Sequence, residues 1–104
     1  MILATTEMIP GHEIVEVLGL ARGNTIRARH IGHDIIARFK GIVGGEIGDY
    51  TKLMAESREQ AIDRMIVHAE SMGANAIVSI RLGTSMIMQS AAEIVAYGTA
   101  VKLR

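Results

Sequence analysis

The chain has 104 residues and a mass of 11.2 kDa, and its 11 basic residues are balanced by 11 acidic ones. This length fits one domain, and the even charge gives no basic surface of the kind that binds nucleic acid or an acidic membrane. Because the sequence contains no cysteine, disulfides, thiolate nucleophiles and cysteine-based zinc or iron–sulfur sites are excluded.

Apolar residues are in surplus for a domain of this size. Glycine together with Ala, Val, Ile, Leu, Met and Phe makes up 60 of the 104 residues, whereas about 45–50% is typical. A small domain with surplus apolar surface tends to hide it against another subunit. Composition alone therefore predicts a homo-oligomer.

The N-terminal residues do not resemble a targeting segment. Pro10, Gly11, His12 and Glu13 interrupt the first apolar run, so we expect no secretory signal. No run approaches the roughly 18 apolar residues that a membrane span needs. These features predict a cytoplasmic protein.

The first third of the chain is rich in strand signals. Residues 1–6 form a short apolar run, typical of an edge strand, and Pro10-Gly11 predicts a turn. Residues 12–20 are rich in β-branched side chains, which predicts a second strand. Arg22-Gly23-Asn24 contains residues that tolerate positive φ, so we expect it to close a hairpin onto a third strand over residues 25–29.

The hydrophobic period then changes to that of a helix. Ile31, Ile35, Phe39 and the pair Ile42-Val43 recur at spacings of three and four, and Gly44, Gly45 and Gly48 end the pattern. Asp49 is placed to cap a second helix, which is expected to end at Met72 with Gly73 as the left-handed residue at its C-terminus. One apolar stripe runs along this second helix, at Leu53, Met54, Ala61, Ile62, Met65, Ile66, Ala69 and Met72.

Two more strands are predicted at the C-terminus, over residues 75–82 and 93–103. Residues 83–92 between them read either as a long loop or as strand ends with a loose turn. The order β-β-β-α-α-β-β predicts an α+β fold in which two helices pack on one face of an antiparallel sheet. Such a sheet leaves open edges, and a ring of subunits is one way to pair them.

Four separated segments of the chain resemble one known family. They are Thr5-Thr6 with Ile14-Val15-Glu16 and Gly19, then Ile42-Val43-Gly44-Gly45 with Gly48, Tyr50 and Lys52, then Gly73–Val78 with Ile80, and finally Gly98–Lys102. In this order, and over essentially the whole chain, they are similar to the YbjQ-like family. The resemblance implies a dodecin-like subunit that assembles into pentamers, sometimes paired as decamers. It implies no established activity, although the family carries a heavy-metal-binding label.

Three residues could form a metal site. On a helix, His30 and Asp34 are one turn apart and His33 lies between them, so all three could meet one divalent ion. Two imidazoles and a carboxylate suit Zn²⁺, Ni²⁺ or Fe²⁺. The alternative is a polar first helical turn in which Asp34 is favoured by the helix dipole. Met86 and Met88 could hold Cu⁺ on one strand face, but methionine also fills irregular apolar gaps.

The glycine-rich segment that includes Gly44, Gly45, Gly48 and Tyr50 is a candidate binding loop. A glycine-rich loop that enters a helix can present N–H groups to an anion. However, Glu46 and Asp49 place negative charge there, and no Lys-Ser/Thr follows the last glycine, so the segment is not a P-loop. The alternative is a tight connection between two helices.

The remaining polar residues give weaker signals. Arg22, Arg27 and Arg29 form a basic patch on the expected hairpin, and a solvated strand face explains them without nucleic acid. His68 lies on the flank of the helical stripe, where a hydrogen-bonded boundary histidine is expected. No catalytic motif is recognisable. Three hypotheses remain open: a homo-oligomeric binding or structural protein, a metal-binding module, and an enzyme whose site forms between subunits near Tyr50.

Overall fold

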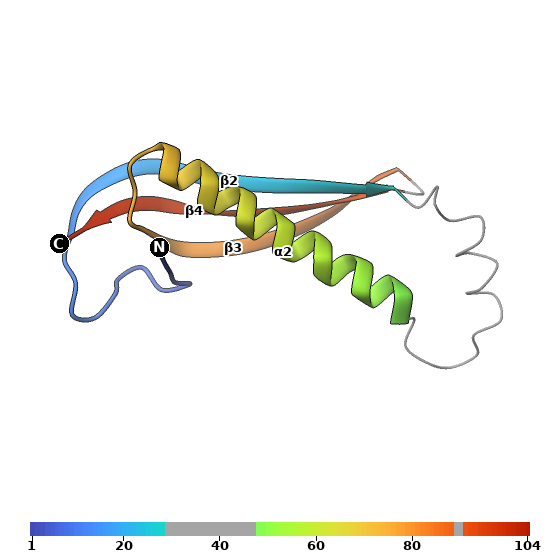
Figure 1. Cartoon of the computed structure of the whole chain (residues 1–104), viewed down its shortest axis with the longest axis horizontal. Helices are drawn as coiled ribbons and strands as arrows, with labels where there is room; N and C mark the ends of the chain where they lie inside the picture. The colour runs from blue at the N-terminus through green and yellow to red at the C-terminus, as the bar shows by residue number, and fades with distance from the viewer. Residues whose placement is uncertain (29–47, 89–90) are drawn as a thin grey trace.

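The computed structural model describes residues 1–28, 48–88 and 91–104 and gives the side chains of 1–26, 51–86 and 91–104. This part of the chain contains four strands and one helix: β1 (Ile2–Leu3), β2 (Ile14–Ala28), α2 (Gly48–Ser71), β3 (Ala76–Met88) and β4 (Ala91–Leu103). The helix crosses one face of the sheet (Figure 1). No helix in the described ranges has the length and apolar character needed to cross a bilayer.

The four strands form one mixed sheet in the order β1-β3-β4-β2. Strands β2 and β3 both pair antiparallel with β4, whereas β1 pairs parallel with β3. The expected antiparallel sheet with two packed helices is therefore wrong. Strand β1 pairs with the edge of β3 through only two residues. A strand this short has no sequence pattern from which its direction could be predicted. The first expected helix lies outside the described residues.

The predicted hairpin at Arg22-Gly23-Asn24 is also wrong. Strand β2 runs through these residues without a turn, and its register against β4 is continuous from Leu20 to Ala28. Gly23 is needed for close packing rather than for a positive φ. The hairpin on which the basic patch was expected is therefore absent, and Arg22 lies on a continuous strand. Whether the three arginines form a patch stays a prediction. The side chain of Arg27 and all of Arg29 lie outside the described part.

Strands β3 and β4 are longer than predicted. Each has 13 residues, which corresponds to about 43 Å at 3.3 Å per residue, whereas strands of about 5–6 residues are typical. Residues 83–88 and 91–92 extend the two strands, so the alternative of strand ends is confirmed over these residues. The expected turn lies at residues 89–90, outside the described part. A bulge between Val78 and Arg81, with Ser79 at φ 55°, bends β3 near its middle.

Helix α2 packs its apolar stripe on the sheet as predicted. Ala61, Met65 and Ala69 are fully buried against small residues of β2 and β4, namely Ala21, Ala96 and Ala100. The helix ends at Ser71, and Gly73 at φ 87° provides the expected left-handed residue after it. Helix α2 contacts β2 most, β4 less and β3 hardly at all.

Gly23 is the point where the helix and strand β2 come closest. A Cβ atom placed there would lie 2.3 Å from both the carbonyl oxygen of Ala61 and the backbone nitrogen of Met65. Both are backbone atoms of α2, so no side-chain rotation could relieve the overlap. Only glycine allows the helix to sit directly on the strand at this position.

A smaller second core lies on the opposite face of the sheet. Ala76, Val78, Val101 and Leu103 are buried there under Ile9 and Ile14. The Asn75 side chain closes this end, because its Oδ1 accepts from the Leu103 N–H at 2.7 Å and its Nδ2 donates to the Leu103 carbonyl at 3.1 Å. The N-terminal segment thus covers part of the face that α2 leaves bare.

The close contact at Gly23 gives the first prediction. Gly23→Ala should lower the free energy of unfolding by about 3 kcal/mol, the upper end of the usual overpacking cost, because the new methyl group meets helix backbone. Gly83→Ala is the matched control, since its Cβ would lie an ordinary 3.4 Å from Val95. That change should be neutral or stabilising by roughly 0.5 kcal/mol. Urea denaturation at one fixed protein concentration measures both, and equal losses would contradict the account.

Candidate functional site

The metal and loop residues predicted from sequence fall largely outside the described ranges. This applies to His30, His33 and Asp34 of the metal hypothesis, and to Gly44 and Gly45 of the loop hypothesis. Gly48 and Tyr50 lie in the first turn of α2, but their side chains are not among those described. Both hypotheses therefore stay predictions.

The methionine hypothesis is only partly testable. Met86 lies near the end of β3 with its side chain 77% exposed, and the Met88 side chain is outside the described set. Within the ranges that the structure describes, no three His, Cys, Asp or Glu side chains come close enough to hold a metal ion.

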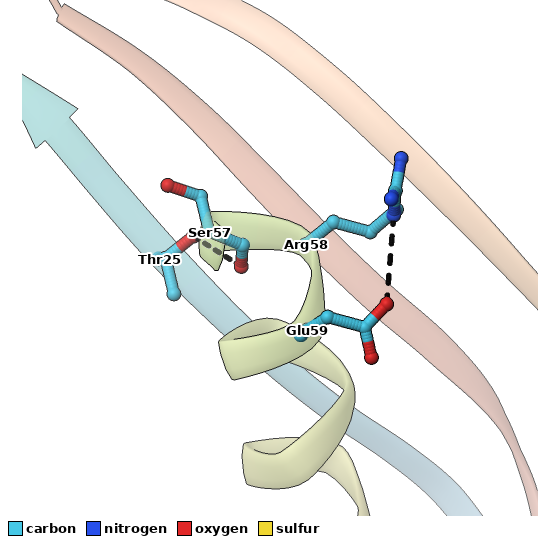
Figure 2. A network of polar contacts seen from close by, with 4 residues as sticks. All are labelled: Thr25, Ser57, Arg58 and Glu59. Carbon is cyan, nitrogen blue, oxygen red and sulfur yellow. Dashed lines mark hydrogen bonds and ion pairs between the residues drawn. The ribbon is translucent and has the colours of Figure 1, made fainter. Parts of the chain in front are cut away.

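The buried hydroxyl groups serve packing. Figure 2 shows Thr25 of β2 beside Ser57 of α2, with the Thr25 hydroxyl donating to the Ser57 carbonyl at 3.1 Å. The Ser57 hydroxyl donates to the Leu53 carbonyl at 2.9 Å. These bonds satisfy the polar groups that the helix contact buries. They hold α2 on β2 at Ser57, one helical turn before Ala61, which Gly23 contacts. The nearby pair of Arg58 and Glu59, 3.8 Å apart, is exposed and adds little.

Side chains of α2 occupy part of the edge of β2. The Arg22 N–H donates to Nδ1 of His68 at 3.1 Å, and Nη1 of Arg64 donates to the Asn24 carbonyl at 2.7 Å. Arg22 and Asn24 therefore point their backbone groups away from β4, toward the outside of the sheet. Since His68 and Arg64 are one helical turn apart, they occupy two successive outward positions of the strand. The expectation of a hydrogen-bonded boundary histidine at residue 68 is confirmed.

The edge of β3 is closed over only half of its length. The N-terminal segment bonds to it through the Ala4 N–H to Ile77, the Ile80 N–H to Ala4 and the Ser79 N–H to Thr6. The backbone N–H and C=O groups of successive strand residues point alternately to one side of the strand and to the other. Because those of Ile80 point away from β4, which we call outward, those of Leu82, Thr84 and Met86 point outward too. Among the described residues, nothing bonds to these outward backbone groups. We call Leu82, Thr84 and Met86 the open edge.

An apolar groove lies beside the open edge, between α2 and the β1–β3 pair. Its volume is about 450 Å³, and it is lined by Leu3, Ala4, Thr5, Ile62, Met65, Ile80, Arg81 and Leu82. Helix α2 sits mainly over β2 and hardly contacts β3, so this side of the sheet is not covered by α2. The guanidinium of Arg81 fixes one rim, where its Nη1 donates to the carbonyls of Thr5 at 3.0 Å and Ile80 at 2.8 Å. The groove has the apolar lining and scarce polar groups of a binding surface.

The opposite face of the sheet carries an exposed mixed surface. Arg22, Tyr97 and Arg81 stand in one row across β2, β4 and β3, and Leu20 and Ile26 are 58% and 59% exposed on the same face. Further along the same face, the side-chain amide of Asn24 on β2 donates to the Glu93 carboxylate on β4 at 3.1 Å. In an isolated subunit, water would cover these large apolar side chains.

The sequence predicted that the sheet has open edges, but not which residues of the edges are occupied and which are open. This depends on where α2 lies on the sheet, which a local pattern does not specify. A signal was present in Arg64 and His68, two polar side chains one turn apart on the flank of an apolar stripe. Such residues commonly hydrogen-bond the rim of the surface that the stripe covers.

Comparisons with known proteins agree over the whole chain. A family model described as "Putative heavy-metal-binding" matches residues 1–104. The chain is 58% identical over 104 residues to a UPF0145 protein of Pseudothermotoga lettingae, covering 100% of this chain and 98% of the relative. It is 55% identical over 103 residues to a UPF0145 protein of Methanosarcina acetivorans, covering 99% and 97%.

A solved structure supports the fold at much lower identity. A crystal structure of a protein of unknown function from Pediococcus pentosaceus, placed in the DUF74 family, is similar with a TM-score of 0.68. The two sequences are 12% identical, and the match covers 100% of this chain and 98% of the other. At that identity the similarity concerns the fold alone.

The hydrogen bond from Arg64 to the edge of β2 gives the second prediction. Arg64→Met keeps an aliphatic stem but removes the donor to the Asn24 carbonyl, and it should lower the free energy of unfolding by about 1 kcal/mol. Arg58→Met is the control on the same helix, because its exposed pair with Glu59 should change stability by less than about 0.5 kcal/mol. Thermal unfolding of both variants tests this. If Arg64→Met is as stable as Arg58→Met, the hydrogen bond from Arg64 to the Asn24 carbonyl does not stabilise the fold.

Proposed function

The chain belongs to the YbjQ-like family, and from that premise we propose that it works as a homo-oligomer of five or ten copies in a binding or structural role. The copy numbers come from the family resemblance. The proposal assigns no reaction to the protein. Its support comes from the surface that a single subunit leaves in water.

The accessible surface is the observation that carries the proposal. It measures 6922 Å², whereas a compact monomer of this mass has about 5,700 Å². The difference of roughly 1,200 Å² is comparable to the approximately 800 Å² that each partner buries in a standard interface. The radius of gyration, 17.2 Å, exceeds the approximately 13 Å of a compact 100-residue domain. Both values exceed those of a compact domain of this length, which supports the proposal that other copies cover part of this surface.

The chemistry of the exposed surface gives further support. Leu20, Ile26 and Tyr97 lie on the uncovered sheet face, and Val17 on the same face is 66% exposed. The apolar groove beside β3 adds a second hydrophobic area on the helix side. Association of copies would remove both areas from water, which is the main favourable term in subunit assembly.

Native mass spectrometry of tag-free protein, with sedimentation at micromolar concentration, gives the third prediction. We expect five or ten copies of the 11.2 kDa chain and no monomer at that concentration. The apolar area that assembly buries explains the expected stability of the complex. A stable, dilute monomer in both measurements would contradict the proposal.

The family's description supports a second candidate function, divalent-metal binding by His30, His33 and Asp34. The donor set of two imidazoles and one carboxylate suits Zn²⁺, Ni²⁺ or Fe²⁺ better than a thiol-seeking metal. Under this candidate the protein would be a metal-binding module, with or without assembly.

Titration calorimetry with ZnCl₂ gives the fourth prediction. If the candidate is right, wild type should bind one ion per subunit, and His33→Ala should lose this binding because it removes one of three ligands. His12→Ala is the control, as residue 12 lies in the N-terminal segment and outside the three ligands. The candidate fails if wild type gives no binding heat, or if both variants bind as wild type does.

A further inference from the structure

Strands β2 and β3, which flank β4 on its two sides, differ in how the rest of the chain occupies their outward edges. The outward groups of β2 at Arg22 and Asn24 are occupied by His68 and Arg64, and α2 lies over that strand. The outward groups of β3 are occupied only as far as Ile80. Uncovered strand edges are sites of pairing with another chain, and proteins that stay monomeric usually block them. On β2, side chains of α2 block two successive outward residues in the middle of the strand. On β3, the outward residues Leu82, Thr84 and Met86 have no partner among the described residues.

The open edge has the length and polarity to pair with itself. Leu82, Thr84 and Met86 each point one N–H and one C=O outward, which makes six backbone groups in a row that no described residue pairs with. In an antiparallel pair with a second copy, centred on Thr84, each Thr84 faces the other and Leu82 of each copy faces Met86 of the other. All six groups of each copy then take part in a two-fold ladder.

The side chains fit the same register. Leu82 and Met86 are 47% and 77% exposed in the single chain, and pairing would set each Leu82 beside a Met86. Methionine is flexible enough to fill the irregular end of the apolar groove, which Leu82 lines. The central contact is a Thr–Thr pair, one of the favourable cross-strand combinations.

The N-terminal segment limits the pairing to these residues. Continuing the ladder would place the second copy opposite Ile80, whose N–H already donates to the Ala4 carbonyl at 3.1 Å. The two-fold axis would stand perpendicular to the joined sheet, so both α2 helices would lie on the same side. The two grooves would then adjoin across the new contact.

We propose that the open edge of β3 is a two-fold contact, in which it forms an antiparallel ladder with the same edge of a second copy. This inference rests on the proposed homo-oligomer and makes it more specific. Because a two-fold contact joins copies in pairs, the assembly must contain an even number of chains. Of the five or ten copies that the family resemblance implies, it selects ten.

Two variants test the contact, and they form the fifth prediction. Met86→Lys places a charge against Leu82 of the second copy, while the exposed site leaves the single chain free to fold. Thr84→Pro removes an outward N–H without touching the ladder to β4, a substitution that edge strands accept. Met8→Lys is the control, because Met8 is 73% exposed and is not one of the residues of the open edge.

Native mass spectrometry and sedimentation of the four proteins give distinct outcomes. We expect an even copy number for wild type and for Met8→Lys. Met86→Lys and Thr84→Pro should halve that number, or raise the concentration for half-dissociation by about tenfold or more. A monomeric wild type would overturn the homo-oligomer itself. An odd wild-type assembly, or unchanged assembly of both β3 variants, would overturn only the β3 contact.

Discussion

The close approach of helix α2 to strand β2 at Gly23 determines most other features of this subunit. With no Cβ at residue 23, backbone atoms of Ala61 and Met65 occupy the space directly above the strand. The neighbouring bond from Thr25 to Ser57 holds the helix in the same position (Figure 2). Helix α2 is thereby placed over one side of the sheet instead of over its centre.

This off-centre position has opposite effects on the two sides of the sheet. On the β2 side, Arg64 and His68 come within reach of the outward backbone groups and occupy them. On the β3 side, the helix hardly touches the strand, which leaves the groove and the open edge. One packing contact thus accounts for two occupied positions on the β2 edge, for the open edge of β3 and for the apolar groove beside it.

The sequence predicted the parts of this arrangement that depend on local periodicity. The stripe of α2 gave the buried face, and Gly73 marked the helix end. The role of Gly23 was predicted wrongly. A glycine between polar residues is compatible both with a turn and with a strand position against which a helix packs closely. The alternation of small residues at 21, 23 and 25 favours the second reading, since it continues one strand face through the supposed turn.

The direction of β1 and the difference between the edges could not be predicted in the same way. A two-residue strand carries no directional signal, and edge protection depends on which side chains reach which strand after packing. The candidate site was missed for this reason: the open edge is defined by backbone groups that lack partners, not by a motif. The residues singled out for metal binding, His30, His33 and Asp34, stay predictions.

Residue-resolved amide hydrogen exchange on the assembled protein tests the account most directly. The amides of Gly83 and Ser85 point toward β4 and should be protected in any state of assembly. If the open edge pairs with a second copy, the amides of Leu82, Thr84 and Met86 should be protected to a similar degree. A strict alternation along β3 in the assembled protein, slow at 83 and 85 but fast at 82, 84 and 86, would contradict the account.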